Sequence, residues 1–128
     1  MKPELLNGAN LAFIGDAYYE LYIRKHLILK NITNQHDLHK LSVKYVSAKG
    51  HSLIVQKLEK YFTPTELSIF KRGRNHKYHL SRKNLNMGEY LNSSGFEALI
   101  GYLYLAEEND RLEEILQMAV AIIEENNE

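Results

Sequence analysis

Leu11-Ala12-Phe13-Ile14-Gly15-Asp16-Ala17-Tyr18-Tyr19-Glu20 is the stretch of sequence that decides the fold. Its composition predicts a helix that is apolar on nearly every side, and such a helix must be buried against several neighbours. Asp16 and Glu20 are the exceptions, and their i, i+4 spacing puts both carboxylates on one face about one turn apart. Burying an ionised carboxylate is unfavourable unless a cation, a hydrogen-bond network or a metal compensates the charge. We therefore expect the rest of the chain to supply a partner for these acids.

A second apolar stretch, residues 96–105, has the same anomaly, because Glu97 is its only charged residue. Two nearly all-apolar helices both belong to the core and can lie side by side. Small residues that would let the two backbones approach closely are Gly15 and Ala17 in the first helix and Ala98 and Gly101 in the second.

Asp16 and Glu97 form a candidate metal site if the two helices pack with these acids facing each other. Two like charges in a low-dielectric environment repel each other unless a cation lies between them. Carboxylate oxygens, with no sulfur ligand nearby, suit Mg²⁺ or Mn²⁺. The alternative is a pair of structural acids, each satisfied by a lysine, an arginine, a tyrosine hydroxyl or a helix N-terminus. Spacing alone does not decide between the two.

Helical periodicity runs along the whole sequence, and we expect one all-α domain over residues 1–128. A break is expected at Gly50, inside a long periodic stretch. Thr63, Pro64 and Glu66 form a strong helix start signal, with Thr as the cap, Pro at the first helical position and Glu completing a capping box. The expected helices cover residues 10–29, 34–62, 64–74, 88–106 with a pause at 92–94, and 111–125, and residues 75–87 are expected to form a loop.

Composition is ordinary for a soluble globular protein, with 45% apolar and 25% charged residues among 128. There is no cysteine, which excludes disulfides and thiolate metal sites. No apolar run approaches the length of a membrane span, and the first residues are not followed by a secretory core. We expect a cytoplasmic protein without membrane contact.

A net charge of zero hides a basic segment, because residues 67–88 contain no acid. Such asymmetry favours a polyanionic partner, and a basic loop without a stacking pattern suits an RNA duplex better than a single strand. A solvated charged loop is the alternative. The candidate RNA-binding residues are Lys71, Arg72, Arg74, Lys77, Arg82 and Lys83 in this segment, with Lys40, Lys44 and Lys49 before it.

Residues 11–17 resemble the ribonuclease III signature, whose centre is an apolar pair, Gly, Asp and a small residue. Residues 96–101, Phe-Glu-Ala-Leu-Ile-Gly, are similar to the second acidic motif of that family. The short length and the segments 38–40, 46–49 and 71–75 resemble Mini-ribonuclease III, the compact branch that lacks a separate double-stranded-RNA-binding domain.

This resemblance implies an all-helical endonuclease domain that works as a homodimer. It also implies Mg²⁺-dependent hydrolysis of double-stranded RNA, with Mn²⁺ as a possible substitute, and a role in maturing the ends of 23S ribosomal RNA precursor. By motif position, Asp16 and Glu97 match the catalytic acids of the family. The expected partners are an RNA duplex and a second copy of the chain.

Three positions depart from the usual pattern of the family. Ala9 and Ala12 stand where its signature carries further acids, and Ser94 replaces the Asp that lies three residues before the second-motif Glu. A sparser metal site is therefore expected, in which Glu20 acts as a substitute acid and Ser94 orients a metal-bound water.

The departures keep a second hypothesis open, a non-catalytic, ribosome-associated RNA-binding module derived from a nuclease domain. The retained Asp16 and Glu97 oppose it. A third hypothesis, a phosphohydrolase of small nucleotides, finds no support in the order of the His and Asp residues. No Gly-rich phosphate loop is present either, so no nucleotide cofactor is expected.

Overall fold

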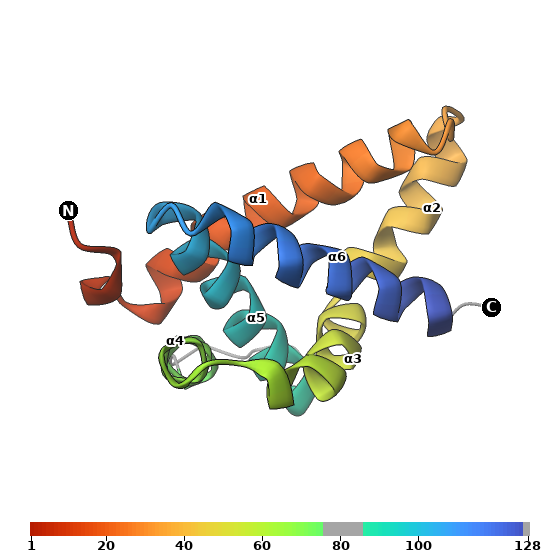
Figure 1. The fold of residues 1–128 in the computed structure, drawn as a ribbon. Helices are drawn as coiled ribbons and strands as arrows, with labels where there is room; N and C mark the ends of the chain where they lie inside the picture. The colour runs from red at the N-terminus through yellow and green to blue at the C-terminus, as the bar shows by residue number, and fades with distance from the viewer. Residues whose placement is uncertain (76–85, 127–128) are drawn as a thin grey trace.

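The computed structural model describes residues 1–75 and 86–126, and every regular element within these ranges is helical (Figure 1). The all-α prediction is therefore confirmed for this part of the chain, while residues 76–85 of the predicted loop lie outside it. No helix among the described residues is long and apolar enough to cross a membrane. The elements are η1 (Pro3–Leu5), α1 (Gly8–Leu29), α2 (Gln35–Val46), α3 (Ala48–Leu58), η2 (Glu59–Tyr61), α4 (Pro64–Arg74), α5 (Met87–Leu105) and α6 (Asn109–Asn126).

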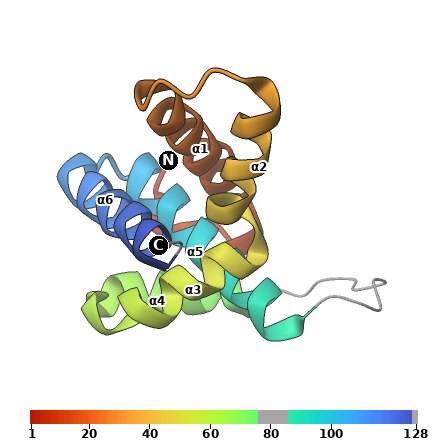
Figure 2. The same ribbon diagram turned by 90° about the vertical axis from the view of Figure 1, so that its right-hand side faces the viewer.

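Helix α5 is the centre of the fold, and α1, α3, α4 and α6 pack around it (Figure 1, Figure 2). Its middle, residues 93–101, is buried on nearly every side, as expected for a helix that is apolar all round. The fully buried large side chains of α5 are Phe96, Leu99, Ile100 and Leu103. Among residues 93–101 only Glu97 reaches solvent, and it is half-buried.

Helices α1 and α5 cross at two glycines, as the small residues in both predict. A Cβ added to Gly15 would lie 1.7 Å from the carbonyl oxygen of Glu97. One added to Gly101 would lie 1.9 Å from the carbonyl oxygen of Leu11. Only glycine permits this approach of one backbone to the other. Ala98 is buried at the same crossing, whereas Ala17 is exposed and takes no part in it.

Two predicted helix interruptions are wrong in position or absent. The break expected at Gly50 falls at Ser47, whose side chain caps α3 by accepting a hydrogen bond from the backbone N–H of Gly50 at 3.1 Å. Gly50 instead allows α2 and α3 to approach, because an added Cβ would lie 2.4 Å from the carbonyl oxygen of Lys44. The pause expected at residues 92–94 is absent, and α5 runs through it because tertiary packing buries Ser93 and Ser94.

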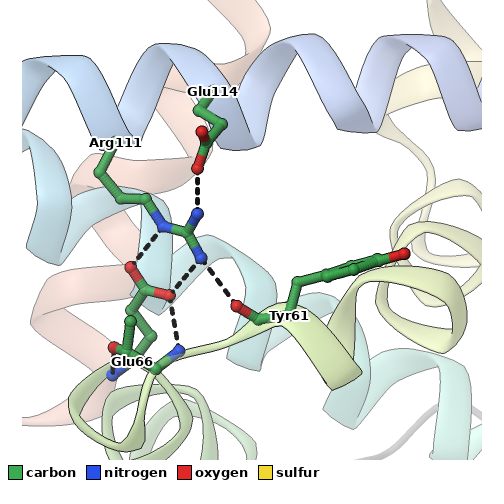
Figure 3. Close-up of polar contacts among 5 residues, drawn as sticks. Tyr61, Glu66, Arg111 and Glu114 are labelled. Atoms are coloured by element: carbon green, nitrogen blue, oxygen red, sulfur yellow. Dashed lines mark hydrogen bonds and ion pairs between the residues drawn. The ribbon is translucent and has the colours of Figure 1, made fainter.

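The predicted capping box at the start of α4 is confirmed, and it is part of a larger polar network that joins α4 to α6 (Figure 3). The Thr63 N–H donates to the Glu66 carboxylate at 2.9 Å. Arg111 on α6 donates to both oxygens of the same carboxylate at 2.8 Å and to the carbonyl oxygen of Tyr61 at 2.9 Å. Arg111 also pairs with Glu114, one turn along α6. The buried Glu66 thus has every partner that its charge requires.

The expectation that α1 is buried on all sides is wrong for the single chain. One face of the helix packs on α5 through buried residues such as Leu11 and Ile23. The opposite face exposes large apolar side chains, with 82% of Phe13, 65% of Leu21 and 70% of Leu29 accessible to solvent. Composition cannot distinguish a core-facing stripe from an apolar stripe that faces outward.

Candidate active site

The crossing of α1 and α5 brings Asp16 and Glu97 together. Asp16 follows Gly15, the residue in closest approach to α5, and Glu97 provides the carbonyl that this glycine faces. The Asp16 carboxyl lies within hydrogen-bonding reach of the Glu97 carboxyl. Asp16 is exposed and Glu97 is half-buried, so the pair opens to solvent on the Asp16 side.

The environment holds Glu97 in its protonated form when no cation is present. Burial is the largest cause, followed by the hydrogen bond and charge of Asp16 and by the charge of Glu20, and together they raise the pKa of Glu97 to about 9. Near neutral pH the Glu97 carboxyl is therefore protonated and can donate a hydrogen bond to an Asp16 carboxyl oxygen. The site carries less negative charge than three ionised acids would give it.

The raised pKa of Glu97 predicts that the metal-free protein loses stability as the pH rises. A carboxyl with a higher pKa in the folded state contributes stability below its unfolded pKa, near 4.5, and this contribution is lost as the pH rises towards 9. Glu97→Gln keeps the hydrogen-bonding shape without the titration. We expect it to be more stable than the wild type at pH 8 in chelator, by about 2 kcal/mol.

Thermal unfolding followed by circular dichroism at pH 4, 6 and 8 checks this prediction. The difference in melting temperature between variant and wild type should shrink towards zero at pH 4, where the wild-type carboxyl is protonated in both states. Melting temperatures that change with pH in the same way in both proteins would contradict it.

The other two predicted site residues lie close to the pair. Glu20 lies one turn beyond Asp16 on α1, where its carboxylate pairs with Arg24 at 3.4 Å and its charge acts on Glu97. Ser94 is buried one turn before Glu97 on α5. Ala12, on the turn of α1 before Asp16, is 8% exposed and adds only apolar contact.

The donor set is sparse but suits a hard divalent cation. Within the described residues there is no group of three or more His, Cys, Asp or Glu side chains that could hold a metal by themselves. Mg²⁺ is commonly bound through one or two carboxylates, with water and substrate phosphate completing its octahedron. The exposed carboxyl of Asp16 and the half-buried carboxyl of Glu97 fit that arrangement, with Glu20 near enough to add its charge.

Some of the predicted RNA-binding residues are exposed, and others form hydrogen bonds within the chain. Lys40, Lys44, Lys49 and Lys71 are exposed on α2, α3 and α4. In contrast, the Arg72 guanidinium donates to the carbonyl oxygens of Glu4 and Leu6 at 2.6 and 2.9 Å and holds the N-terminal segment in place.

Arg74 is also engaged within the chain, because its Nε donates to the side-chain oxygen of Asn92 at 3.0 Å. Lys77, Arg82 and Lys83 lie outside the described residues. The exposed lysines on α2 and α3 are therefore the clearest candidates for phosphate contacts.

Sequence reasoning missed one residue near the acids, the buried His51 on α3. It is 1% exposed, its Nδ1 is hydrogen-bonded to Ser93 at 2.7 Å, and its ring contacts those of Tyr19 and Phe96. The available signal is the i, i+3, i+4, i+7 spacing that places His51 on one face with Ile54, Val55 and Leu58.

Comparison with known proteins places this geometry in context. A sequence model described as the Ribonuclease III domain matches residues 9–108, which include both acid-bearing segments. The Mini-ribonuclease 3 of Clostridium tetani is 42% identical over 124 residues, which cover 96% of this chain and 82% of that protein. The Mini-ribonuclease 3 of Streptococcus pneumoniae is 43% identical over 122 residues, covering 94% and 95%. The crystal structure of protein FN1578 from Fusobacterium nucleatum superposes with a TM-score of 0.82 at 31% identity, covering 91% of this chain and 93% of that one.

Proposed function

Because the chain belongs to the ribonuclease III family, in its Mini-ribonuclease 3 branch, we propose that this ribonuclease is a divalent-metal-dependent endonuclease of double-stranded RNA. The observation that carries the proposal is the Asp16–Glu97 pair at the crossing of α1 and α5. Two acids held in contact by the closest packing in the fold make a poor structural pair, because they repel each other when ionised. They make a good site for a cation that meets a phosphate.

In the proposed mechanism Asp16 and Glu97 would hold Mg²⁺, or Mn²⁺ in its place, through carboxylate oxygens and water. Such an ion would supply Lewis-acid activation of the attacking water and would neutralise charge on the phosphate and the leaving 3′ oxygen. A bound cation would favour the ionised form of Glu97, because its charge offsets the burial and the acidic neighbours that raise the pKa of this carboxyl. Glu20 adds negative charge behind Asp16, and Ser94 orients a water on the Glu97 side.

The direct test is incubation of the protein with a long RNA duplex in Mg²⁺, with chelator as the control. Discrete cleavage products that need the metal support the endonuclease. Binding without cleavage would support the alternative of a non-catalytic RNA-binding module, which the alanines at positions 9 and 12 and Ser94 favour. A protein that neither binds nor cleaves the duplex would contradict both the endonuclease and the RNA-binding module.

The natural substrate that we propose is the duplex formed by the ends of 23S ribosomal RNA precursor, processed in the cytoplasm by the single domain of residues 1–128. The family resemblance supports this substrate. Precursor transcript incubated with the protein should be cut within that duplex, and cutting at scattered positions elsewhere would contradict the proposal.

Lys44 and Lys49 are proposed to contact phosphates of the RNA backbone. Replacing both should cause a salt-dependent loss of affinity for duplex RNA. Both are exposed near the junction of α2 and α3. The double variant Lys44→Ala/Lys49→Ala should bind duplex RNA more weakly at 100 mM salt and reduce the slope of log K against log salt by about two. Lys57→Ala, an exposed lysine in the last turn of α3, is the control and should change neither quantity. An unchanged slope in the double variant would contradict the assignment.

A homodimer is the proposed assembly, and the exposed apolar face of α1 supports it. Phe13, Ala17 and Leu21 follow one another at i, i+4 spacing and are all exposed in the single chain. Contiguous exposed apolar side chains are typical of a protein interface. Phe13→Ser should weaken self-association about 30-fold or more in sedimentation experiments, with an unchanged circular dichroism spectrum. Tyr61→Ser, at an exposed aromatic residue of η2, should leave self-association unchanged.

A further inference from the structure

A cluster of three rings lies beneath the crossing of α1 and α5, and it includes the buried His51. Tyr19 from α1, His51 from α3 and Phe96 from α5 each lie 5.1 Å from the other two, measured between ring centroids. Tyr19 meets the other two rings edge-on, at 90° to Phe96 and 73° to His51. We refer to these three residues as the ring cluster. It joins the two acid-bearing helices to α3.

The ring cluster is more polar than its position requires. Burial lowers the pKa of His51 to about 3, so its imidazole is neutral throughout the working range. The His51 Nε2 and the Tyr19 hydroxyl are both buried with no hydrogen-bond partner among the described residues. Apolar side chains of similar volume would fill this space without leaving polar atoms unpaired. Residues that break the rules of core packing are commonly those that function requires.

The side-chain hydrogen bond of His51 reaches the turn of α5 that precedes Glu97. Its Nδ1 lies 2.7 Å from the Ser93 hydroxyl, one turn before Glu97. Its ring also packs on Phe96, the residue next to Glu97, and on Tyr19, which lies one turn after Asp16. His51 therefore touches both helices that carry the acids, on the side away from solvent.

We propose that His51 is a positioning residue of the active site, which sets the rotation of α5 against α1 through its bond to Ser93 and its place in the ring cluster. This inference rests on the proposed nuclease function. Side-chain ends lie about 6 Å from a helix axis, so a rotation of about 10° moves the Glu97 carboxylate by about 1 Å. A displacement of that size is enough to lower a catalytic rate by about 100-fold.

Three substitutions of His51 distinguish the roles of its two ring nitrogens. His51→Leu fills the space but loses both polar atoms, and it should lower kcat about 10- to 100-fold with KM for the RNA duplex within about threefold. Its melting temperature should stay close to that of the wild type, because the unpaired buried Nε2 is removed while the Ser93 hydroxyl loses this partner. His51→Asn places an amide near the position of Nδ1 and should recover most of kcat. His51→Gln reaches the position of Nε2 instead and should not.

Ser93→Ala tests the same bond from its other end and decides the matter if His51→Leu fails to fold. It should lower kcat as His51→Leu does, and the double variant should be no worse than either single one. Tyr45→Phe is the matched control, because it also removes a side-chain hydrogen bond of a buried residue, that from Tyr45 to Glu124 at 3.0 Å, which joins α2 to α6. It should lower the melting temperature without changing kcat.

The outcomes distinguish the two proposals. If the wild type does not cleave duplex RNA in Mg²⁺, the nuclease function fails, and the inference about His51 fails with it. If the wild type cleaves and both Ser93→Ala and a folded His51→Leu keep kcat within about twofold, the inference alone is overturned. A fall in kcat that follows the loss of melting temperature, in Tyr45→Phe as in the others, would also overturn it.

Discussion

Glu97→Gln is expected to lower the single-turnover rate of duplex RNA cleavage in Mg²⁺ by about a thousandfold or more. Glutamine has the shape of the protonated carboxyl and can still donate to Asp16, so the fold and the helix crossing should be kept. What it lacks is the negative charge that a divalent ion requires of a ligand. Asp16→Asn should have a comparable effect for the same reason.

The measurement is the rate of cleavage of an end-labelled RNA duplex at saturating protein, over a range of Mg²⁺ concentrations. Glu59→Gln, the same substitution at an exposed acid of η2, is the control and should cleave as the wild type does. RNA binding measured in chelator should be equal in all variants. If Glu97→Gln cleaved within about tenfold of the wild type, Glu97 would not be a metal ligand.

Gly15→Ala adds one methyl group, and it is expected to destabilise the protein more than any other glycine-to-alanine substitution. The added Cβ would lie 1.7 Å from the carbonyl oxygen of Glu97, far inside contact distance. The obstacle is backbone in the middle of a buried helix, which no side-chain rotation can relieve. Helices α1 and α5 must separate, and a close-packed core resists such a movement. We expect a loss of about 3 kcal/mol or more, or a failure to fold.

Gly88→Ala is a matched control for this prediction. Gly88 is also a helical glycine, in the first turn of α5, but the nearest atom to its added Cβ is the Asn86 side-chain oxygen at an ordinary 3.5 Å. Alanine favours a helix over glycine, so this variant should be as stable as the wild type or slightly more so. Urea unfolding of the three proteins compares them, and equal midpoints for Gly15→Ala and the wild type would contradict the close crossing.

The sequence predicts the central arrangement because its signals there are strong and independent. Two apolar stretches, each interrupted by acids and small residues, indicate that the helices pack closely with Asp16 and Glu97 near each other, and the structure brings these residues together. The capping box at Thr63 is likewise a local pattern with a local cause. The catalytic roles of these acids stay predictions.

The sequence fails where the outcome depends on packing between distant residues. Gly50 looks like a helix break, yet its missing side chain serves the approach of α2, and the break is made by the cap of Ser47. Nothing adjacent in sequence shows that His51 meets Ser93 across the core. An exposed Phe13 and a buried Leu11 look alike in a list of apolar residues, because only the neighbours of a helix decide which face is covered.

The crossing of α1 and α5 also has a consequence for the life of the protein in the cell. Asp16 is made early in synthesis and Glu97 late, and the two acids meet only after most of the chain has left the ribosome and the core has closed around α5. A nascent or partly folded chain therefore has half of the proposed metal site. If the enzyme cuts ribosomal RNA duplexes, the fold itself delays that activity until the protein is complete, and the ribosome that makes the nuclease is protected from it without an inhibitor.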